Sequence, residues 1–196
     1  MPETHGEDKY VVMFGGLHTE SAAFKALGEF LDGSGWVNAL VNADIASPGT
    51  AESFLRVSHL AKARRAHQIT AAALYVLQQS AYNDYKAAFS AWCSKVASIQ
   101  PQFSFWSQVL ELKVLVLEIV RSIREGNFKS YVESVTALMP WMFALDHVNY
   151  ARWLSVYVRD MATLQTSHPS VYQKFTSGAC RTNGENSIGL EELFAR

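Results

Sequence analysis

His18 and Glu20 stand two residues apart and directly follow an apolar run, residues 10–14, and the pair Gly15 and Gly16. If the run forms a strand, both side chains can reach the crevice at its end. There, an imidazole and a carboxylate can hold a divalent metal ion or exchange protons with a substrate. Two ligands do not complete a site, however. In the alternative, the glycines form a tight turn, His18 makes a local hydrogen bond and Glu20 favours the positive end of the next helix.

The segment FALDHVNYARW, residues 143–153, places a second group of polar side chains between apolar flanks. On a helix, Asp146, Asn149 and Arg152 fall near one face. The simpler interpretation makes Asp146 the N-cap of a helix, where its carboxylate accepts backbone N–H groups. The other is a buried polar network in which His147 or Arg152 pairs with a carboxylate from elsewhere in the chain. Asp146 and His147 therefore join the two residues above as catalytic candidates.

Four basic residues, Arg56, Lys62, Arg64 and Arg65, form the only local excess of positive charge, since Glu52 is the sole acidic residue between positions 51 and 67. Such a cluster can contact phosphate groups, and these four residues are the nucleic-acid-binding candidates. On a helix, however, they spread over more than one face, and no aromatic side chains that could stack on bases are interleaved with them. A solvated basic helix is the alternative.

The charged fraction, the net charge and the two cysteines limit the kinds of function that the chain can have. Charged residues make up 18% of the 196 residues, below the usual share of about 25%. This indicates either a well-buried helical core or an apolar surface that meets a partner, and we favour the partner surface. The net charge of −1 gives no general attraction to nucleic acid or to membranes. Cys93 and Cys180 lie far apart and outside any CxxC motif. We therefore expect a reducing compartment, without a disulfide framework or a zinc knuckle.

The chain shows no targeting signal for secretion or membrane insertion. Its N-terminus has neither a basic region nor an apolar run of the kind that forms a secretory signal. The most apolar stretch, residues 109–120, is interrupted by Glu111, Lys113 and Glu118. It is also shorter than the roughly 20 residues that span a bilayer. We expect an intracellular protein, cytoplasmic or nuclear, that is neither secreted nor inserted in a membrane.

The elements that position these residues begin with one predicted strand, residues 10–14. Thr19 then caps a helix whose apolar residues recur at helical spacing and which the glycines of residues 32–35 end. A lone strand has no sheet to join within this chain. The chain therefore reads as a piece of a larger α/β protein.

The following segment is predicted to be helical as well. Residues 36–43 form a short helix, and the turn at residues 47–49 makes Thr50 the next N-cap. Residues 51–98 lack proline and glycine and carry aromatic side chains along one helix face. A break near residues 60–63 is compatible with this pattern.

Pro101 is predicted to open a helix with two parallel apolar stripes, which makes it the central helix of the bundle. We expect four of its residues to be nearly fully buried: Trp106, Leu112, Val116 and Ile119. Gly126 should end this helix, and Asn127 should cap the next one.

That next helix should extend over residues 128–139, and Pro140 should kink or break the chain there, because it disfavours a helical conformation at the residue before it. A last long helix is predicted for residues 147–165. The predicted fold is mainly α, a bundle of about five to seven helices with one N-terminal β-strand. A single domain, residues 1–177, is followed by a loose tail, residues 178–196.

Four strings in collinear order, MFGGLHTE, LDGSGW, RRAHQITAAALYVLQ and FALDHVNYARW, carry a resemblance that spans residues 6–175. Together they resemble an uncharacterised, mobile-element-associated protein family of marine invertebrates. In the longer members of that family, a strand with an Asp in a DQP-like motif precedes this region, and a segment rich in Asp, His and Glu follows it. This arrangement is similar to a ribonuclease-H-like transposase core with a helical insertion.

The resemblance implies that this chain is the helical insertion region, a fragment without the flanking acidic motifs. Two-metal chemistry needs carboxylates from separated segments. We therefore predict a non-catalytic helical interaction module that is derived from a mobile-element protein and holds no cofactor. Its partner would be another protein or the missing segments of the parent protein.

The alternative is a fragment of a ribonuclease-H-like transposase or nuclease. In that case His18, Glu20 and Asp146 would complete an active site whose other residues come from missing flanks or another chain. This alternative implies a divalent metal ion and nucleic-acid binding, which composition supports only weakly.

Overall fold

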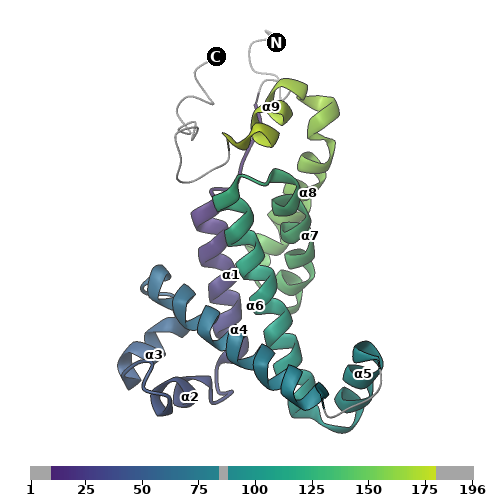
Figure 1. Ribbon diagram of the computed structural model, residues 1–196. Coiled ribbons are helices and arrows are strands. Elements are labelled where there is room, and N and C mark those ends of the chain that lie inside the picture. The colour runs from purple at the N-terminus through teal and green to yellow at the C-terminus, as the bar shows by residue number, and fades with distance from the viewer. Residues whose placement is uncertain (1–9, 84–87, 180–196) are drawn as a thin grey trace. The chain divides into compact units, whose positions relative to one another are not determined.

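The computed structural model describes residues 10–83 and 88–179, and within these ranges the chain is mainly helical, as predicted (Figure 1). The described ranges contain nine α-helices and no strand, so the predicted strand is wrong and the helix count exceeds the expected five to seven. The chain divides into two compact units: unit 1, residues 1–20 and 116–196, and unit 2, residues 21–115. The single domain over residues 1–177 stays a prediction.

Unit 2 begins with three helices: the second part of α1 (Gly16–Leu31), α2 (Trp36–Asn42) and α3 (Pro48–Leu55). α1 ends where the sequence predicts, because Gly33 and Gly35 adopt left-handed conformations with φ of 68° and 85°. α3 begins at Pro48 after the N-cap Ser47, since proline suits the first helical position. The predicted N-cap, Thr50, lies inside the helix, and its hydroxyl pairs with that of Ser47 at 2.9 Å.

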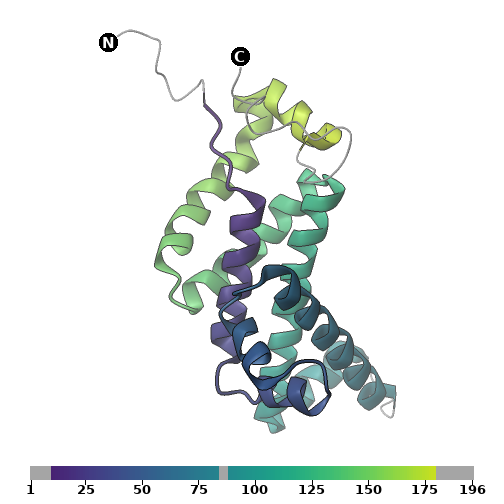
Figure 2. The ribbon, with the colours of Figure 1, turned by 90° about the vertical axis from the view of Figure 1, so that its left-hand side faces the viewer.

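The remaining helices of unit 2 are α4 (Leu60–Asn83), α5 (Phe89–Ile99) and the first part of α6 (Pro101–Glu125). α6 begins at Pro101 as predicted. The turn between α3 and α4 lies at residues 56–59, just before the expected break, and α2, α3 and α4 are neighbours (Figure 2). In this turn Val57 has a φ of 54°, a conformation that is uncommon for a β-branched residue.

α1 and α3 approach each other closely at Gly28. A Cβ atom at this position would lie 2.8 Å from the carbonyl carbon of Leu55 and 3.0 Å from its Cα. The two helices also bury Leu27 and Phe54. Glycine is therefore required here because the backbone of α3 occupies the space of a side chain.

α6 carries the predicted apolar stripes, and most of the expected core positions are buried. Leu112, Val116 and Ile119 are completely buried. Trp106 is only half-buried, so this part of the prediction is wrong. The reason is that Trp106 lines an open groove between α4 and α6, described below.

In unit 1, residues 10–15 form no regular secondary structure. The ring of Phe14 lies 4.8 Å from the ring of Tyr157 on α8 (Val148–Ser167), and the Tyr157 hydroxyl donates to Met13 Sδ at 3.5 Å. A strand needs a neighbouring strand for its backbone groups. The described residues offer none, and the side chains of Met13 and Phe14 contact α8 instead.

α1 begins at Gly16, three residues before the predicted N-cap. Thr19 is buried, and its Oγ1 donates to the carbonyl oxygen of Gly15 at 3.3 Å. It therefore lies within the first turn of the helix rather than ahead of it.

α7 (Phe128–Ala144) is capped as predicted, because Asn127 Oδ1 accepts the N–H of Ser130 at 3.1 Å. The helix does not break at Pro140 but continues to Ala144, so the alternative of a break is wrong, while a kink at Pro140 stays a prediction. Pro140 is exposed, so solvent can reach the carbonyl group that has lost its hydrogen bond, which lowers the cost of an internal proline.

α7 and α8 lie side by side (Figure 1). The described chain then closes with α9 (Pro169–Lys174) and one π-helical turn, Phe175–Ala179. The predicted loose tail lies outside the described residues from residue 180 onward.

Candidate functional site

The most unusual side chains of the structure are Lys113 on α6 and His67 on α4, which meet in the core of unit 2. Lys113 Nζ lies 2.6 Å from His67 Nδ1. Both side chains are completely buried. An amine and an imidazole are rarely buried together, because either group is stabilised by solvent when it is protonated.

Aromatic rings enclose this pair on two sides. The imidazole of His67 is stacked between Phe24 of α1, at 5.0 Å, and Trp36 of α2, at 4.7 Å. Lys113 Nζ lies 4.6 Å from the centroid of the Trp36 ring, within the range of a cation–π contact. Trp36 is held in place because its Nε1–H donates to Thr70 Oγ1 at 2.8 Å. Four helices of unit 2 thus contribute to one polar core site.

No carboxylate compensates for the charge of this site among the described residues, where the only polar contacts of Lys113 are those above. Burial lowers the pKa of Lys113 well below its usual value. Burial, and second the positive charge of Lys113, lower the pKa of His67 well below its usual value. His67 Nε2 is buried as well and has no hydrogen-bond partner in the described part of the chain. The arrangement can hold or release a proton in a site closed to solvent.

Sequence reasoning missed both residues. His67 lies two residues after Arg65 and carries no motif of its own, and Lys113 enters the sequence analysis only as an interruption of an apolar stretch. The available signal was the position of Lys113, which falls on the same helix face as the apolar residues Val109 and Val116. A lysine in that position must either be exposed or find a buried partner.

Farther along the same two helices of unit 2, α4 and α6 form an apolar groove with a volume of about 210 Å³. The buried face of α4, which includes Ala63 and His67, continues toward the C-terminal end of the helix as the wall of this groove. Eight residues line it: Leu74, Leu77, Gln78, Ala81, Phe103, Trp106, Ser107 and Leu110. Leu77 is 66% exposed, so a large apolar side chain faces solvent here.

The catalytic candidates belong to unit 1, and the structure does not join them in a metal site. His18 is exposed in the first turn of α1, whereas Glu20 is buried. The hydroxyl of Tyr150 on α8 donates to the carbonyl oxygen of His18 at 3.5 Å, so the beginnings of these two helices are close. Within the described residues, no three His, Cys, Asp or Glu side chains are placed to hold one metal ion.

The simpler interpretation, in which Asp146 is the N-cap of α8, is wrong. His147 occupies that position, and Asp146 has a φ of 54°. The N–H groups of Asp146 and His147 donate to the carbonyl oxygens of Phe143 and Met142 at 3.3 and 2.9 Å. These bonds close the end of α7, where a left-handed residue is required and Asp is tolerated. The exposed Asp146 therefore belongs to the turn that ends α7. His147 is half-buried.

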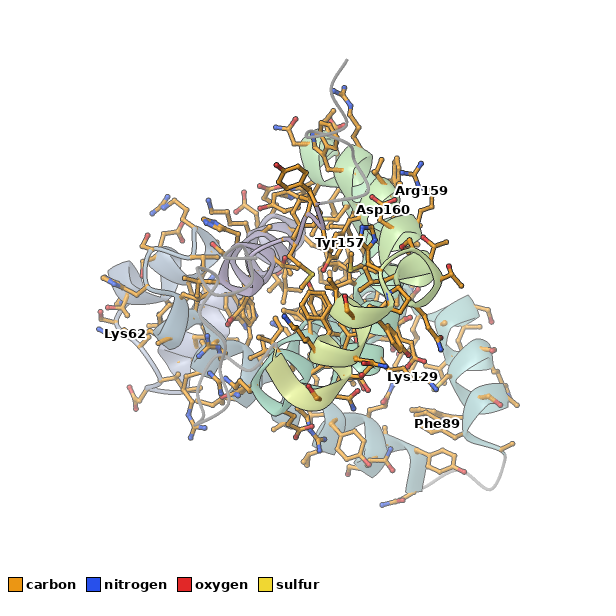
Figure 3. All side chains as sticks on the ribbon, turned by 90° about the horizontal axis from the view of Figure 1, so that it is seen from above. Lys62, Phe89, Lys129, Tyr157, Arg159 and Asp160 are labelled. Atoms are coloured by element: carbon orange, nitrogen blue, oxygen red, sulfur yellow. The ribbon has the colours of Figure 1, made fainter. Side chains whose placement is uncertain are left out.

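The basic candidates lie at the end of α3 and in the first turns of α4. Arg56 is 3.9 Å from Glu52, and both side chains are exposed. Lys62 and Arg65 are exposed, and Figure 3 shows Lys62 pointing outward, whereas Arg64 is half-buried. Nucleic-acid contact through these residues stays a prediction. Arg159 and Asp160 on α8, also labelled in Figure 3, form an exposed ion pair at 2.8 Å.

Calorimetric titration of the chain with zinc, magnesium and manganese is expected to show no stoichiometric binding. A divalent ion needs several ligand atoms at about 2.0–2.2 Å from one point, and the candidate side chains do not provide that convergence. Tight one-to-one binding that disappears in both His18→Ala and Asp146→Ala would contradict this expectation.

Among the described residues, no helix is both long and apolar enough to cross a bilayer. Neither the curated proteins nor the solved structures contain a match to this chain. One family does match it over residues 75–186, a range that begins in the groove-lining half of α4 and includes Lys113 but not His67. Because the match covers more than half of the sequence, the chain belongs to this family, the domain of unknown function DUF8702.

Proposed function

We propose that the chain is a non-catalytic interaction module whose unit 2 binds an acidic amphipathic helix of a partner protein in the groove between α4 and α6. The observation that carries this proposal is the open apolar stripe of α4, where Leu77 faces solvent next to Leu74 and Trp106. Apolar surface that is continuous with a core is typical of a docking site.

The size of the groove favours side chains of a protein over a small molecule. Its volume of about 210 Å³ is below the range of about 300–1,000 Å³ that is usual for small-molecule sites. From Leu74 to Ala81 the groove follows two turns of α4, a length of about 10 Å. Two turns of a partner helix, with apolar residues at i, i+3 or i+4, and i+7, match this length.

The charge of α4 favours an acidic partner. This helix contains Lys62, Arg64 and Arg65 and no acidic residue over its whole length, Leu60–Asn83. Lys62 and Arg65 are exposed. Acidic flanks on a partner helix would be attracted to this surface, while a basic helix with the same apolar residues would be repelled.

Two labelled synthetic helices with identical leucine positions test the proposal by fluorescence anisotropy. One carries glutamates on its polar face and the other carries lysines. We expect binding of the acidic peptide only, and we expect Leu77→Asp to weaken it by at least about tenfold, because a charged side chain would then enter the groove.

Val76→Asp is the matched control, since Val76 is 64% exposed on the same helix but does not line the groove. It should change the affinity less than about twofold. Equal binding of both peptides, or equal loss in both variants, would refute the docking site. Concentration-dependent dimerisation that Leu77→Asp abolishes would instead identify a second copy of the chain as the occupant.

The derivation of this module from a mobile-element protein is part of the proposal and is supported by the sequence resemblance alone. The alternative, a ribonuclease-H-like nuclease fragment, rests on the same resemblance. It would be favoured by metal-dependent nucleic-acid cleavage in a chain that carries its flanking segments, provided that Asp146→Asn abolishes the cleavage.

A further inference from the structure

The contact between Lys113 and His67 joins α6 to α4 inside unit 2, and its geometry limits how many protons it can hold. His67 Nδ1 can accept a hydrogen bond from Lys113 Nζ only while Nδ1 carries no proton. If both groups were protonated, two donors with positive charge would face each other at 2.6 Å. The closed packing therefore accommodates at most one added proton, and so one positive charge, on the pair.

Within the described residues of unit 2, no buried acidic side chain lies beside the pair to compensate for a second proton. Trp36 and Phe24 cover the two faces of the imidazole, and His67 Nε2 has no hydrogen-bond partner among residues 10–83 and 88–179. α2 contains no titratable residue. The charged residues of the other helices that enclose the pair within unit 2 are all exposed or half-buried, namely Lys25 and Glu29 of α1, Lys62, Arg64 and Arg65 of α4, and Glu111 of α6. Glu20, the remaining acidic residue of α1, belongs to unit 1.

We propose that this pair is a proton-dependent switch in which uptake of a second proton separates α4 from α6 around His67 and Lys113. With one proton or none, the imidazole accepts a hydrogen bond and the two helices stay in contact. With two, the like charges can be stabilised only by water, which reaches them when the helices separate. The inference does not depend on the binding of a partner helix in the groove.

The direction of the pH dependence follows from burial. The pKa of His67 is lowered in the closed structure, first by burial and then by the charge of Lys113. An open state has an imidazole pKa near 6.5, so it binds the proton more readily than the closed state. The contribution of His67 to the stability of the closed state is therefore fully present above about pH 6.5 and is lost as the pH falls below that value.

Hydrogen exchange of the whole chain, measured by mass spectrometry at about pH 7.5 and about pH 5 and corrected for the intrinsic exchange rate, tests the switch. We expect the protection of α4 amides around His67 to fall at least about tenfold at the lower pH. α7 and α8 of unit 1 should change much less and serve as the internal control. Unchanged protection of α4, or an equal loss in α7 and α8, would overturn the proposal.

Variants assign the effect to the pair. Lys113→Met removes the second positive charge, and the double variant His67→Phe with Lys113→Met leaves no titratable group while retaining an aromatic ring between Phe24 and Trp36. The double variant should lose the pH dependence of α4 protection, whereas Lys113→Met should only weaken it, because burial alone still lowers the pKa of His67. The exposed residues supply matched controls, His59→Phe and Lys62→Met, which should retain it. If the double variant keeps the pH dependence of the natural chain, the switch does not reside in this pair.

Discussion

Replacing Gly28 with alanine should destabilise unit 2 by about 3 kcal/mol, at the upper end of the usual cost of overpacking. The added Cβ would lie 2.8 Å from the carbonyl carbon of Leu55, which is backbone and cannot rotate away. α1 and α3 would have to move apart, and the packing of their buried residues, including Leu27 and Phe54, would loosen. Urea denaturation followed by circular dichroism measures the loss, and hydrogen exchange of α3 assigns it to unit 2.

Gly49→Ala is the matched control, because Gly49 lies in α3 and a Cβ there meets nothing within 4 Å. Alanine is the better helix former, so this variant should be more stable by about 0.5–1 kcal/mol. The opposite signs of the two substitutions separate the effect of the close approach from that of helix propensity. A Gly28→Ala variant as stable as the natural chain would show that α1 and α3 are not in contact at this position.

Replacing Leu112 with alanine should cost about 2–5 kcal/mol, because Leu112 is completely buried in α6 and its removal leaves a cavity. The measurement is the same urea denaturation. Val114→Ala provides the control, since Val114 lies two residues away and is 44% exposed. It should change the stability by no more than about 0.5 kcal/mol. Equal effects of the two substitutions would mean that Leu112 is not part of a packed core.

The helix boundaries that the sequence predicted correctly depend on neighbouring residues alone. Gly33 supplies a left-handed conformation, Pro101 suits a first helical turn, and Asn127 caps the helix that follows it. The incorrect predictions depend on distant residues. Residues 10–14 form no strand because no second strand is present in the described chain, and Pro140 is tolerated because its side of α7 is exposed.

The contact between Lys113 and His67 could not be predicted either, because it also depends on residues that are distant in the sequence. The lysine on the apolar face of α6 could be recognised from helical spacing, but its partner His67 lies 46 positions earlier. Between them stand the end of α4, the whole of α5 and the beginning of α6, and the sequence does not define the directions of these helices. The stacking of His67 between Phe24 and Trp36 depends on the arrangement of α1, α2 and α4 in space. The sequence alone therefore indicates Lys113 as an unusual residue but does not indicate its partner His67.

Val57 illustrates how such a sequence can change during evolution. Its left-handed conformation costs roughly 1–2 kcal/mol relative to a glycine. Its side chain is only 9% exposed, and burying a valine contributes roughly 1.5–3 kcal/mol. These two contributions nearly cancel, so selection acting on stability has little reason to prefer a glycine in this turn. Related sequences could therefore exchange valine for glycine at this position without a change in fold. The turn would then persist in sequences that lack the residues usually found in turns.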